Sequence, residues 1–333
     1  MRIGVVGTGA MGRNHVRVLR ELPPVELVGV ADADFETACR VAESNATRPY
    51  RSHHELIEKE RPDALTVAVP TNSHTAVVID GLAAGCHVLV EKPIAGTLAE
   101  ADELVAAARA AARVLAVGHI ERYNPAVREL KRRLDDGQLG KLFQLTTRRV
   151  GPFPERIRDV GVVVDLATHD LDVMRYLTGS EIVRVYAETR RAVHTTKEDL
   201  LSGLVRFEDG AVGVLQINWL TPTKARELTV TGGRGMFRAN YLTQDLFFYE
   251  NAEISSDRWH QMSILRGVSE GPMVMYAIQK REPLRAEMEA FVSAIDGEPS
   301  GIVSGEDGRE ALRLALALVE SGEDGKVVVV GGQ

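Results

Sequence analysis

A glycine-rich turn between an apolar strand and a helix constrains this chain more than any other feature. Residues 3–6 are apolar and lead into residues 7–12, a G-x-G-x-x-G pattern. A second apolar stretch, residues 25–31, ends at Asp32, twenty positions past the last of these glycines. Strand, glycine turn, helix and acidic strand end are the parts of a dinucleotide-binding βαβ unit. We therefore expect a dinucleotide at this turn.

The residue types in this unit indicate which dinucleotide it binds. Gly7 permits the tight turn, Gly9 lets backbone N–H groups approach the pyrophosphate, and Gly12 allows close packing of helix and strand. The Asp32 carboxylate can accept hydrogen bonds from ribose hydroxyls and would repel a 2′-phosphate, so NAD is favoured over NADP. A simple turn at Asp32 and Asp34 is the alternative interpretation. The expected cofactor contacts in this unit are Gly7, Thr8, Gly9, Ala10, Met11, Gly12 and Asp32.

Composition excludes several classes of protein. The 333 residues are 44% hydrophobic, enough for the cores of two domains. The formal net charge of −7 argues against a nucleic-acid binder with a basic surface. Cys39 and Cys86 form no C-x-x-C pair, so we expect neither a metal site nor a redox cysteine. Because the chain shows no signal-peptide pattern and no membrane-spanning apolar run, we expect a cytoplasmic protein without a membrane partner.

The pattern of elements changes near residue 120. Before it, strand and helix patterns alternate, which predicts an α/β Rossmann domain over residues 1–120 with a doubly wound parallel sheet. After it, strands follow one another through short turns, which predicts an α+β domain over residues 121–333 with a large, mainly antiparallel open sheet. The expected strands are 3–6, 27–31, 64–69, 87–90, 115–117, 142–150, 183–191, 202–208, 212–219, 226–231 and 235–240. The expected helices are 14–22, 35–44, 74–84, 98–112, 125–135, 284–295 and 305–320.

Three clusters of polar residues can carry chemistry. The first is Glu91-Lys92-Pro93, directly after the apolar strand 87–90. An open α/β sheet presents ligand contacts at the carboxyl ends of its strands. A lysine there can stabilise the alkoxide that forms as hydride leaves. A surface lysine at a strand end is the alternative, and the bond before Pro93 is a candidate for the cis form.

The second cluster lies at the expected domain boundary, in residues 118–125. Ligand sites favour such junctions, and His119, Arg122 and Asn124 are candidates to line the cleft. A capping or packing function for His119 is an equal alternative.

The third cluster, residues 165–170, follows an apolar stretch and leads into a helical pattern. Asp165 and His169 are four residues apart, so on a helix they share a face and can meet one ligand atom. Alcohol oxidation needs such a pair, with a base for the hydroxyl proton and a carboxylate to orient the imidazole. Asp165 as a helix N-cap and His169 as a core residue are the alternatives.

In this order, the motifs resemble the glucose-fructose oxidoreductase / inositol dehydrogenase / MocA (Gfo/Idh/MocA) family over nearly the whole chain. The resemblance implies an N-terminal NAD-binding Rossmann domain and a C-terminal α+β domain whose open sheet forms the subunit interface of a homodimer or homotetramer. It also implies that Lys92, Asp165 and His169 are the catalytic residues. Further NAD contacts implied by the resemblance are Pro70, Thr71, Asn72, His74, Glu91 and Lys92.

The resemblance leaves open which sugar, cyclitol or nucleotide sugar is the substrate. Residues 148–160 place four arginines just before the catalytic segment of an otherwise acidic chain. Because guanidinium groups bind phosphate bidentately, Arg149, Arg156 and Arg158 favour an anionic substrate; a solvated charged face is the alternative. The stretch is similar to family members that oxidise the C3 hydroxyl of UDP-N-acetylglucosamine with NAD.

Other functions stay open at this stage. An inositol or simple-sugar dehydrogenase, or a keto-sugar reductase, would use the same catalytic residues. A non-catalytic NAD-binding regulatory protein would not need them, and the presence of all three argues against it.

Overall fold

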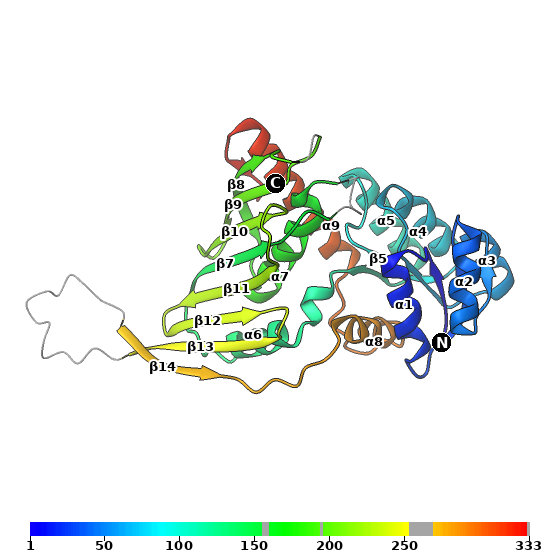
Figure 1. The fold of residues 1–333 in the computed structure, drawn as a ribbon, viewed down its shortest axis with the longest axis horizontal. Helices are drawn as coiled ribbons and strands as arrows, with labels where there is room; N and C mark the ends of the chain where they lie inside the picture. The colour runs from blue at the N-terminus through cyan, green and yellow to red at the C-terminus, as the bar shows by residue number, and fades with distance from the viewer. Residues whose placement is uncertain (155–159, 194–195, 253–268, 332–333) are drawn as a thin grey trace, which may run out of the picture. The chain divides into compact units, whose positions relative to one another are not determined.

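The chain forms two compact units. A computed structural model describes residues 1–154, 160–193, 196–252 and 269–331. Unit 1 contains Met1–Tyr123 and Arg281–Ala315, and unit 2 contains Asn124–Lys280 and Leu316–Gln333. Helices and strands carry the labels of Figure 1. Among the described residues, no helix has the length and apolar character needed to cross a bilayer.

Unit 1 is built on a six-stranded, all-parallel sheet with the order β3-β2-β1-β4-β5-β6. The strand order reverses between β1 and β4, and in such sheets a dinucleotide binds at the carboxyl ends near this point. The predicted Rossmann fold is therefore confirmed. The strands are β1 Arg2–Val6, β2 Glu26–Ala31, β3 Pro49–Tyr50, β4 Ala64–Val67, β5 His87–Glu91 and β6 Leu115–Gly118.

Helices flank this sheet, and α1 packs against α2 while α4 packs against α5. The short β3 and α3 between residues 49 and 60 are absent from the sequence prediction, because neither is long enough to show a clear period. Ser52 caps α3 by accepting a hydrogen bond from the Glu55 amide at 3.2 Å. The helices are α1 Ala10–Arg20, α2 Phe35–Asn45, α3 His53–Glu60, α4 His74–Ala83 and α5 Leu98–Ala111, with short 3-10 turns η1 Thr71–Ser73 and η2 Ile120–Tyr123.

A distant part of the chain completes unit 1. Helix α8, Pro283–Ile295, contributes Met288 and Phe291 to the core that also holds Ile3 and Leu19. The sequence analysis places this helix in the C-terminal domain of residues 121–333, and in the structure α8 packs on α1. The domain division at residue 120 stays a prediction.

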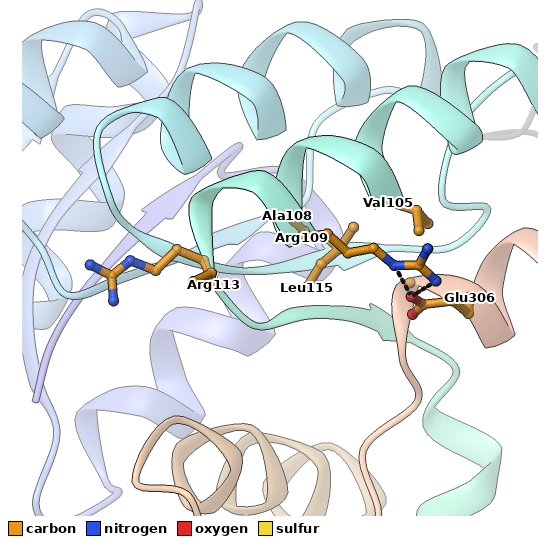
Figure 2. Close-up of a pocket in the computed structure, with 8 residues that line it drawn as sticks. Val105, Ala108, Arg109, Arg113, Leu115 and Glu306 are labelled. Carbon is orange, nitrogen blue, oxygen red and sulfur yellow. Dashed lines mark hydrogen bonds and ion pairs between the residues drawn. The ribbon is translucent and has the colours of Figure 1, made fainter.

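The start of α9, Gly305–Asp324, also belongs to unit 1. Figure 2 shows Arg109 of α5 directed at Glu306, with Leu115 beside them; Nη2 of Arg109 lies 2.7 Å from Oε1 of Glu306. A Cβ on Gly305 would stand 2.9 Å from the Leu115 side chain, so the two segments pack closely. The shallow pocket between them contains none of the predicted site residues; its lining is Val105, Ala108, Arg109, Ala112, Arg113, Leu115, Gly305 and Glu306.

Unit 2 is built on a nine-stranded sheet with the order β14-β13-β12-β11-β7-β10-β9-β8-β15. Among the strands that the structure describes in this sheet, β7 and β10 alone pair in parallel, so the predicted large, mainly antiparallel sheet is confirmed. The strands are β7 Leu142–Val150, β8 Ile182–Arg190, β9 Leu200–Phe207, β10 Val212–Asn218, β11 Ala225–Gly232, β12 Gly235–Asn240, β13 Asp245–Ala252, β14 Ser269–Met275 and β15 Val328–Val329.

Buried residues alternate with half-buried or exposed residues along β9, β10 and β12. In β9, Leu201 and Val205 are buried, whereas Ser202 and Leu204 between them are exposed. This alternation of period two is typical of a sheet that is covered on one side. Assembly into a homodimer or homotetramer through this sheet stays a prediction.

Helix α6, Pro125–Asp135, lies at the start of unit 2, and its N-terminus is capped by Asn124. Oδ1 of Asn124 accepts from the Ala126 amide at 3.1 Å, and its Nδ2 donates to the Tyr241 carbonyl oxygen at 3.0 Å. Pro125 occupies the first helical position, where its missing N–H costs nothing. Asn124 therefore fastens α6 to the loop after β12.

We predict that Asn124→Ala lowers the free energy of unfolding by about 2 kcal/mol, since it removes both a helix cap and a buried hydrogen bond. Asn124→Ser retains the capping oxygen and should lose about half as much. Urea unfolding of the three proteins measures the difference. Equal stability of all three would contradict the assignment.

Candidate active site

The glycine turn after β1 has the geometry that a dinucleotide requires. Gly7 has φ of +90°, and a Cβ there would stand 2.5 Å from the Ala68 carbonyl oxygen. A Cβ on Gly12 would stand 1.8 Å from the Gly7 carbonyl oxygen, so α1 can approach the turn only without a side chain. A Cβ on Gly9, in contrast, would meet open space, with no atom beyond its chain neighbours within 4 Å. Gly7 and Gly12 therefore serve packing, and Gly9 serves access.

The N-terminus of α1 suits an anionic group. Helix α1 begins at Ala10, four residues earlier than predicted, and Gly9 occupies the N-cap without a side chain to bond the first amides. The first turn of α1 contains no acidic residue among these described positions. Free amides and the positive end of the helix dipole favour a pyrophosphate here. These residues fit NAD.

Asp32 lies directly after β2 and already accepts three hydrogen bonds. Its Oδ2 accepts from the amide and the hydroxyl of Thr8 at 2.6 and 2.7 Å, and its Oδ1 accepts from the Asp34 amide at 2.9 Å. The alternative interpretation of Asp32 as a turn residue is thus also correct. A carboxylate has about four acceptor positions, so the three bonds orient the group and leave capacity for a ribose hydroxyl.

The loop after β4 contains the other expected nucleotide contacts. Pro70 precedes the turn η1, which holds Thr71 and an exposed Asn72 at the carboxyl end of β4. His74 differs: it is 1% exposed, with Nδ1 at 2.9 Å from the Pro93 oxygen and Nε2 at 3.0 Å from the Val69 oxygen. Burial lowers the pKa of His74, although both carbonyl oxygens act in the opposite direction. The structure thus gives His74 the function of tying two loops together.

Glu91 and Lys92 stand at the carboxyl end of β5, and the Lys92–Pro93 peptide bond is cis, as anticipated. Glu91 is buried, and its Oε1 lies 2.9 Å from Nε2 of His15 in α1. Its Oε2 accepts from the Lys92 amide at 3.3 Å. Gly118, the β6 partner of Glu91, gives the carboxyl group room, since a Cβ there would lie 3.1 Å from it.

The Glu91 carboxyl group is ionised in spite of its burial. Burial raises its pKa, but the hydrogen bond and charge of His15 and the charge of Lys92 outweigh that effect and lower the pKa below its ordinary value. A carboxylate only accepts, so Nε2 of His15 is the donor. This pair joins α1, whose N-terminus suits the pyrophosphate, to β5, which leads into Lys92.

Sequence reasoning missed His15, although a signal was present. Its neighbours Gly12, Val16 and Leu19 form the buried face of α1, and His15 lies on the same face with 0% exposure. A histidine on the buried face of a helix needs a partner, and Glu91, which the sequence analysis gives only as an NAD contact, is an acid that can supply one.

Asp165 and His169 lie on consecutive helical segments of unit 2. Asp165 belongs to a π-helical turn, η3 Val163–Ala167, and His169 to α7 Thr168–Thr178. Both are buried, at 6% and 8% exposure. Asp165 lies inside the π turn, so the alternative of an N-cap is wrong. Wide turns of this kind occur frequently at functional sites.

The π turn is held at its start by a buried carboxylate. Oε1 of Glu198 accepts from the Val163 amide at 3.2 Å, and the Glu198 carbonyl oxygen accepts from the Val162 amide at 2.9 Å. A Cβ on Gly161 would stand 2.0 Å from this carboxylate, so a larger residue there would displace the Glu198 side chain. Glu198 is a second residue that sequence reasoning missed, because it is distant in the chain.

Three of the expected substrate residues have partners within the chain, and the contacts of this set with a substrate stay a prediction. Arg149 is 3% exposed, and its Nε lies 2.9 Å from Oδ2 of Asp170. Nη1 of Arg122 lies 3.2 Å from Oδ2 of Asp307 in unit 1. Asn124 caps α6, and His119 is 1% exposed. Arg156 and Arg158 lie outside the described residues.

The fold and the glycine turn define a dinucleotide-binding protein with a second, sheet-based unit, and known proteins agree. A family model described as an oxidoreductase family with an NAD-binding Rossmann fold matches residues 1–119, and the Gfo/Idh/MocA C-terminal domain model matches residues 127–238. The chain belongs to the Gfo/Idh/MocA family. It is an oxidoreductase whose cofactor is NAD, as the sequence predicts.

Two relatives and one solved structure illustrate the similarity. The UDP-N-acetylglucosamine 3-dehydrogenase of Acidithiobacillus ferrooxidans is 31% identical over 316 residues, which is 95% of each chain. The myo-inositol 2-dehydrogenase of Thermotoga maritima is 28% identical over 344 residues, and 98% of each chain is covered. A structure of the Acidithiobacillus enzyme has a TM-score of 0.85 at 31% identity, with 97% of this chain and 98% of that chain covered.

We predict that alanine at Gly12 lowers stability, whereas alanine at Gly9 weakens NAD binding. Gly12→Ala should destabilise unit 1 by at least about 2 kcal/mol, because its Cβ must displace backbone. Gly9→Ala should leave stability unchanged and weaken NAD binding by about tenfold or more, because its Cβ occupies the approach of the pyrophosphate. Urea unfolding and NAD titration calorimetry separate the two. Unchanged NAD affinity in Gly9→Ala would refute the assignment of the turn.

We predict that Glu91→Gln is less stable than wild type at pH 7 and that the difference narrows in acid. The lowered pKa means that the Glu91 carboxylate stabilises the fold above the pKa of the unfolded chain, about 4.3, and that this stabilisation is lost as pH falls through the folded-state pKa. Chemical unfolding between pH 7 and about pH 3 measures this change, because the stabilisation is lost only below about pH 4.3. Glu58→Gln, at an exposed position of α3, is the control. Its free energy of unfolding should differ little from that of wild type, and by the same amount at every pH.

Proposed function

We propose that this enzyme oxidises a secondary hydroxyl of a nucleotide sugar, and specifically the C3 hydroxyl of UDP-N-acetylglucosamine, to the ketone. The observation that carries the substrate is the similarity to the Acidithiobacillus UDP-N-acetylglucosamine 3-dehydrogenase, which extends over 95% of both chains. Lys92, Asp165 and His169 supply the acid–base and electrostatic groups that the reaction needs.

The proposed chemistry divides the work between these three side chains. His169 takes the proton of the C3 hydroxyl, and Asp165 orients the imidazole or holds a neighbouring hydroxyl. The Lys92 ammonium stabilises the alkoxide as negative charge develops on the oxygen. NAD, when bound, accepts the hydride that leaves C3 with its electron pair. The products are the 3-keto sugar, NADH and one proton.

The surroundings of these residues support the assignment within each unit. Lys92 follows the buried Glu91 carboxylate, whose pKa is lowered in part by the charge of Lys92, so the two groups attract each other. In unit 2, the π turn and its Glu198 cap fix the backbone at Asp165. A rigid backbone limits the reorientation that a catalytic pair must undergo.

An inositol or simple-sugar dehydrogenase is the second candidate. The Thermotoga myo-inositol 2-dehydrogenase is nearly as similar, at 28% identity over 98% of each chain. The buried ion pair of Arg149 with Asp170 also weakens the case for an anionic substrate, because that guanidinium already has a carboxylate partner. Substrate choice therefore needs a direct comparison.

We predict that NAD reduction is confined to UDP sugars in a panel of UDP-N-acetylglucosamine, UDP-glucose, myo-inositol and glucose. A parallel set with a 2-keto acid as external hydride acceptor detects turnover if NADH stays bound. Turnover of inositol or glucose alone would overturn the substrate while leaving the oxidoreductase chemistry intact.

In the same assay, Lys92→Ala and His169→Ala should each lower kcat by about a hundredfold or more while NAD still binds. Arg148→Ala, at an exposed position in the same stretch as the predicted arginines, is the control. Normal turnover in either active-site variant would remove that residue from the mechanism.

A further inference from the structure

Two adjacent histidines and one aspartate meet on the surface of unit 1. His53 and His54 open α3, and Asp80 lies in the second half of α4. Nε2 of His53 lies 2.8 Å from Oδ2 of Asp80, and Nε2 of His54 lies 3.6 Å from the same oxygen. One ligand atom from each side chain falls within 4.8 Å of the other two. None of the proposed catalytic or cofactor residues belongs to this cluster.

The geometry points to a binding site for a divalent transition metal, which we propose is Zn²⁺. Zinc binds imidazole nitrogen and carboxylate oxygen at about 2.0–2.2 Å, so two ligands of a tetrahedral ion stand about 3.3 Å apart. The observed separations of 2.8 and 3.6 Å lie on either side of that value. Small side-chain rotations would bring the three atoms to equal spacing around an ion.

The two rings converge more than their positions in the helix would suggest. Consecutive helical residues ordinarily diverge, yet the ring centroids of His53 and His54 are 4.0 Å apart, with an interplanar angle of 36°. Both Nε2 atoms face the same carboxylate oxygen of Asp80. An ion among three donors accounts for the second imidazole.

The donor set selects the kind of metal. Two imidazoles and one carboxylate suit Zn²⁺, Ni²⁺ or Cu²⁺, whereas Mg²⁺ and Ca²⁺ take oxygen ligands. Three protein ligands leave a fourth position to water. The ligands come from two helices, so the ion would link α3 to α4 and stabilise unit 1. Cysteine spacing could not reveal this site, because it uses no cysteine.

Zinc titration of the tag-free, full-length protein after removal of metal by EDTA tests the proposal. We expect one saturable site by calorimetry, visible absorption of tetrahedral Co²⁺ on cobalt substitution, and a higher melting temperature with Zn²⁺ than with EDTA. His53→Gln and Asp80→Asn should each weaken zinc binding by at least about tenfold. Glu58→Gln on α3 and His87→Gln on β5 are controls that should bind as wild type.

His54→Gln keeps the test decisive if the other variants fold poorly. The His54 side chain is 67% exposed and makes the longer contact, so its loss should leave the melting temperature in EDTA unchanged while zinc binding still weakens at least about tenfold. Zinc affinity equal in wild type and His54→Gln, or no saturable zinc binding by the wild type, would overturn the proposal. Neither result depends on the substrate assay.

Discussion

The close approach of α1 to the turn after β1 is the contact on which the rest of unit 1 depends. A single Cβ on Gly12 would stand 1.8 Å from the Gly7 carbonyl oxygen. This approach brings the first amides of α1 to the carboxyl ends of β1 and β4, where the strand order reverses. Because the same helix carries His15, it also delivers the partner that keeps Glu91 ionised beside Lys92. Cofactor binding and the electrostatics of the proposed catalytic lysine thus share one packing constraint.

In unit 2, different contacts position the segments that contain Asp165 and His169. Buried carboxylates do most of the positioning: Glu198 caps the π turn that contains Asp165, and Asp170 neutralises Arg149. Breaking a buried ion pair by removing one partner costs several kcal/mol, so these groups specify the local structure strongly. The segment around His169 is therefore held by long-range contacts rather than by helix propensity alone.

Elements with strong local signals could be predicted from the sequence, and α6 and β12 have the predicted bounds. The amphipathic period, Pro125 at the first helical position and the glycines near residue 235 are all local features. The short β3 and α3 could not be predicted, because too few residues carry the period. The joining of α8 to unit 1 depends on packing against α1, about 270 residues away in the chain, which no local pattern encodes.

Some features of the predicted site could likewise be inferred from the sequence, and others depend on the fold. The glycine turn and Asp32 follow from local residue types. The bond before Pro93, only a candidate for the cis form in the sequence analysis, is cis in the structure. Arg122 and Asn124 are candidates to line a cleft, and Arg149 is a candidate to bind an anionic substrate. Each also has a partner within the chain, and the substrate contacts stay a prediction. A charge in a sequence shows that a partner is needed, and only the fold shows whether that partner is a ligand or another residue of the chain.

Transfer of an isotope label tests most directly whether a sugar hydroxyl carbon gives its hydride to NAD. UDP-N-acetylglucosamine carrying deuterium at C3 is incubated with the enzyme and NAD, and the recovered NADH and sugar are analysed by mass spectrometry. The account predicts NADH that carries one deuterium together with a 3-keto sugar that has lost it. Recovery of unlabelled NADH, or of sugar with its deuterium intact and NAD unreduced, would contradict it.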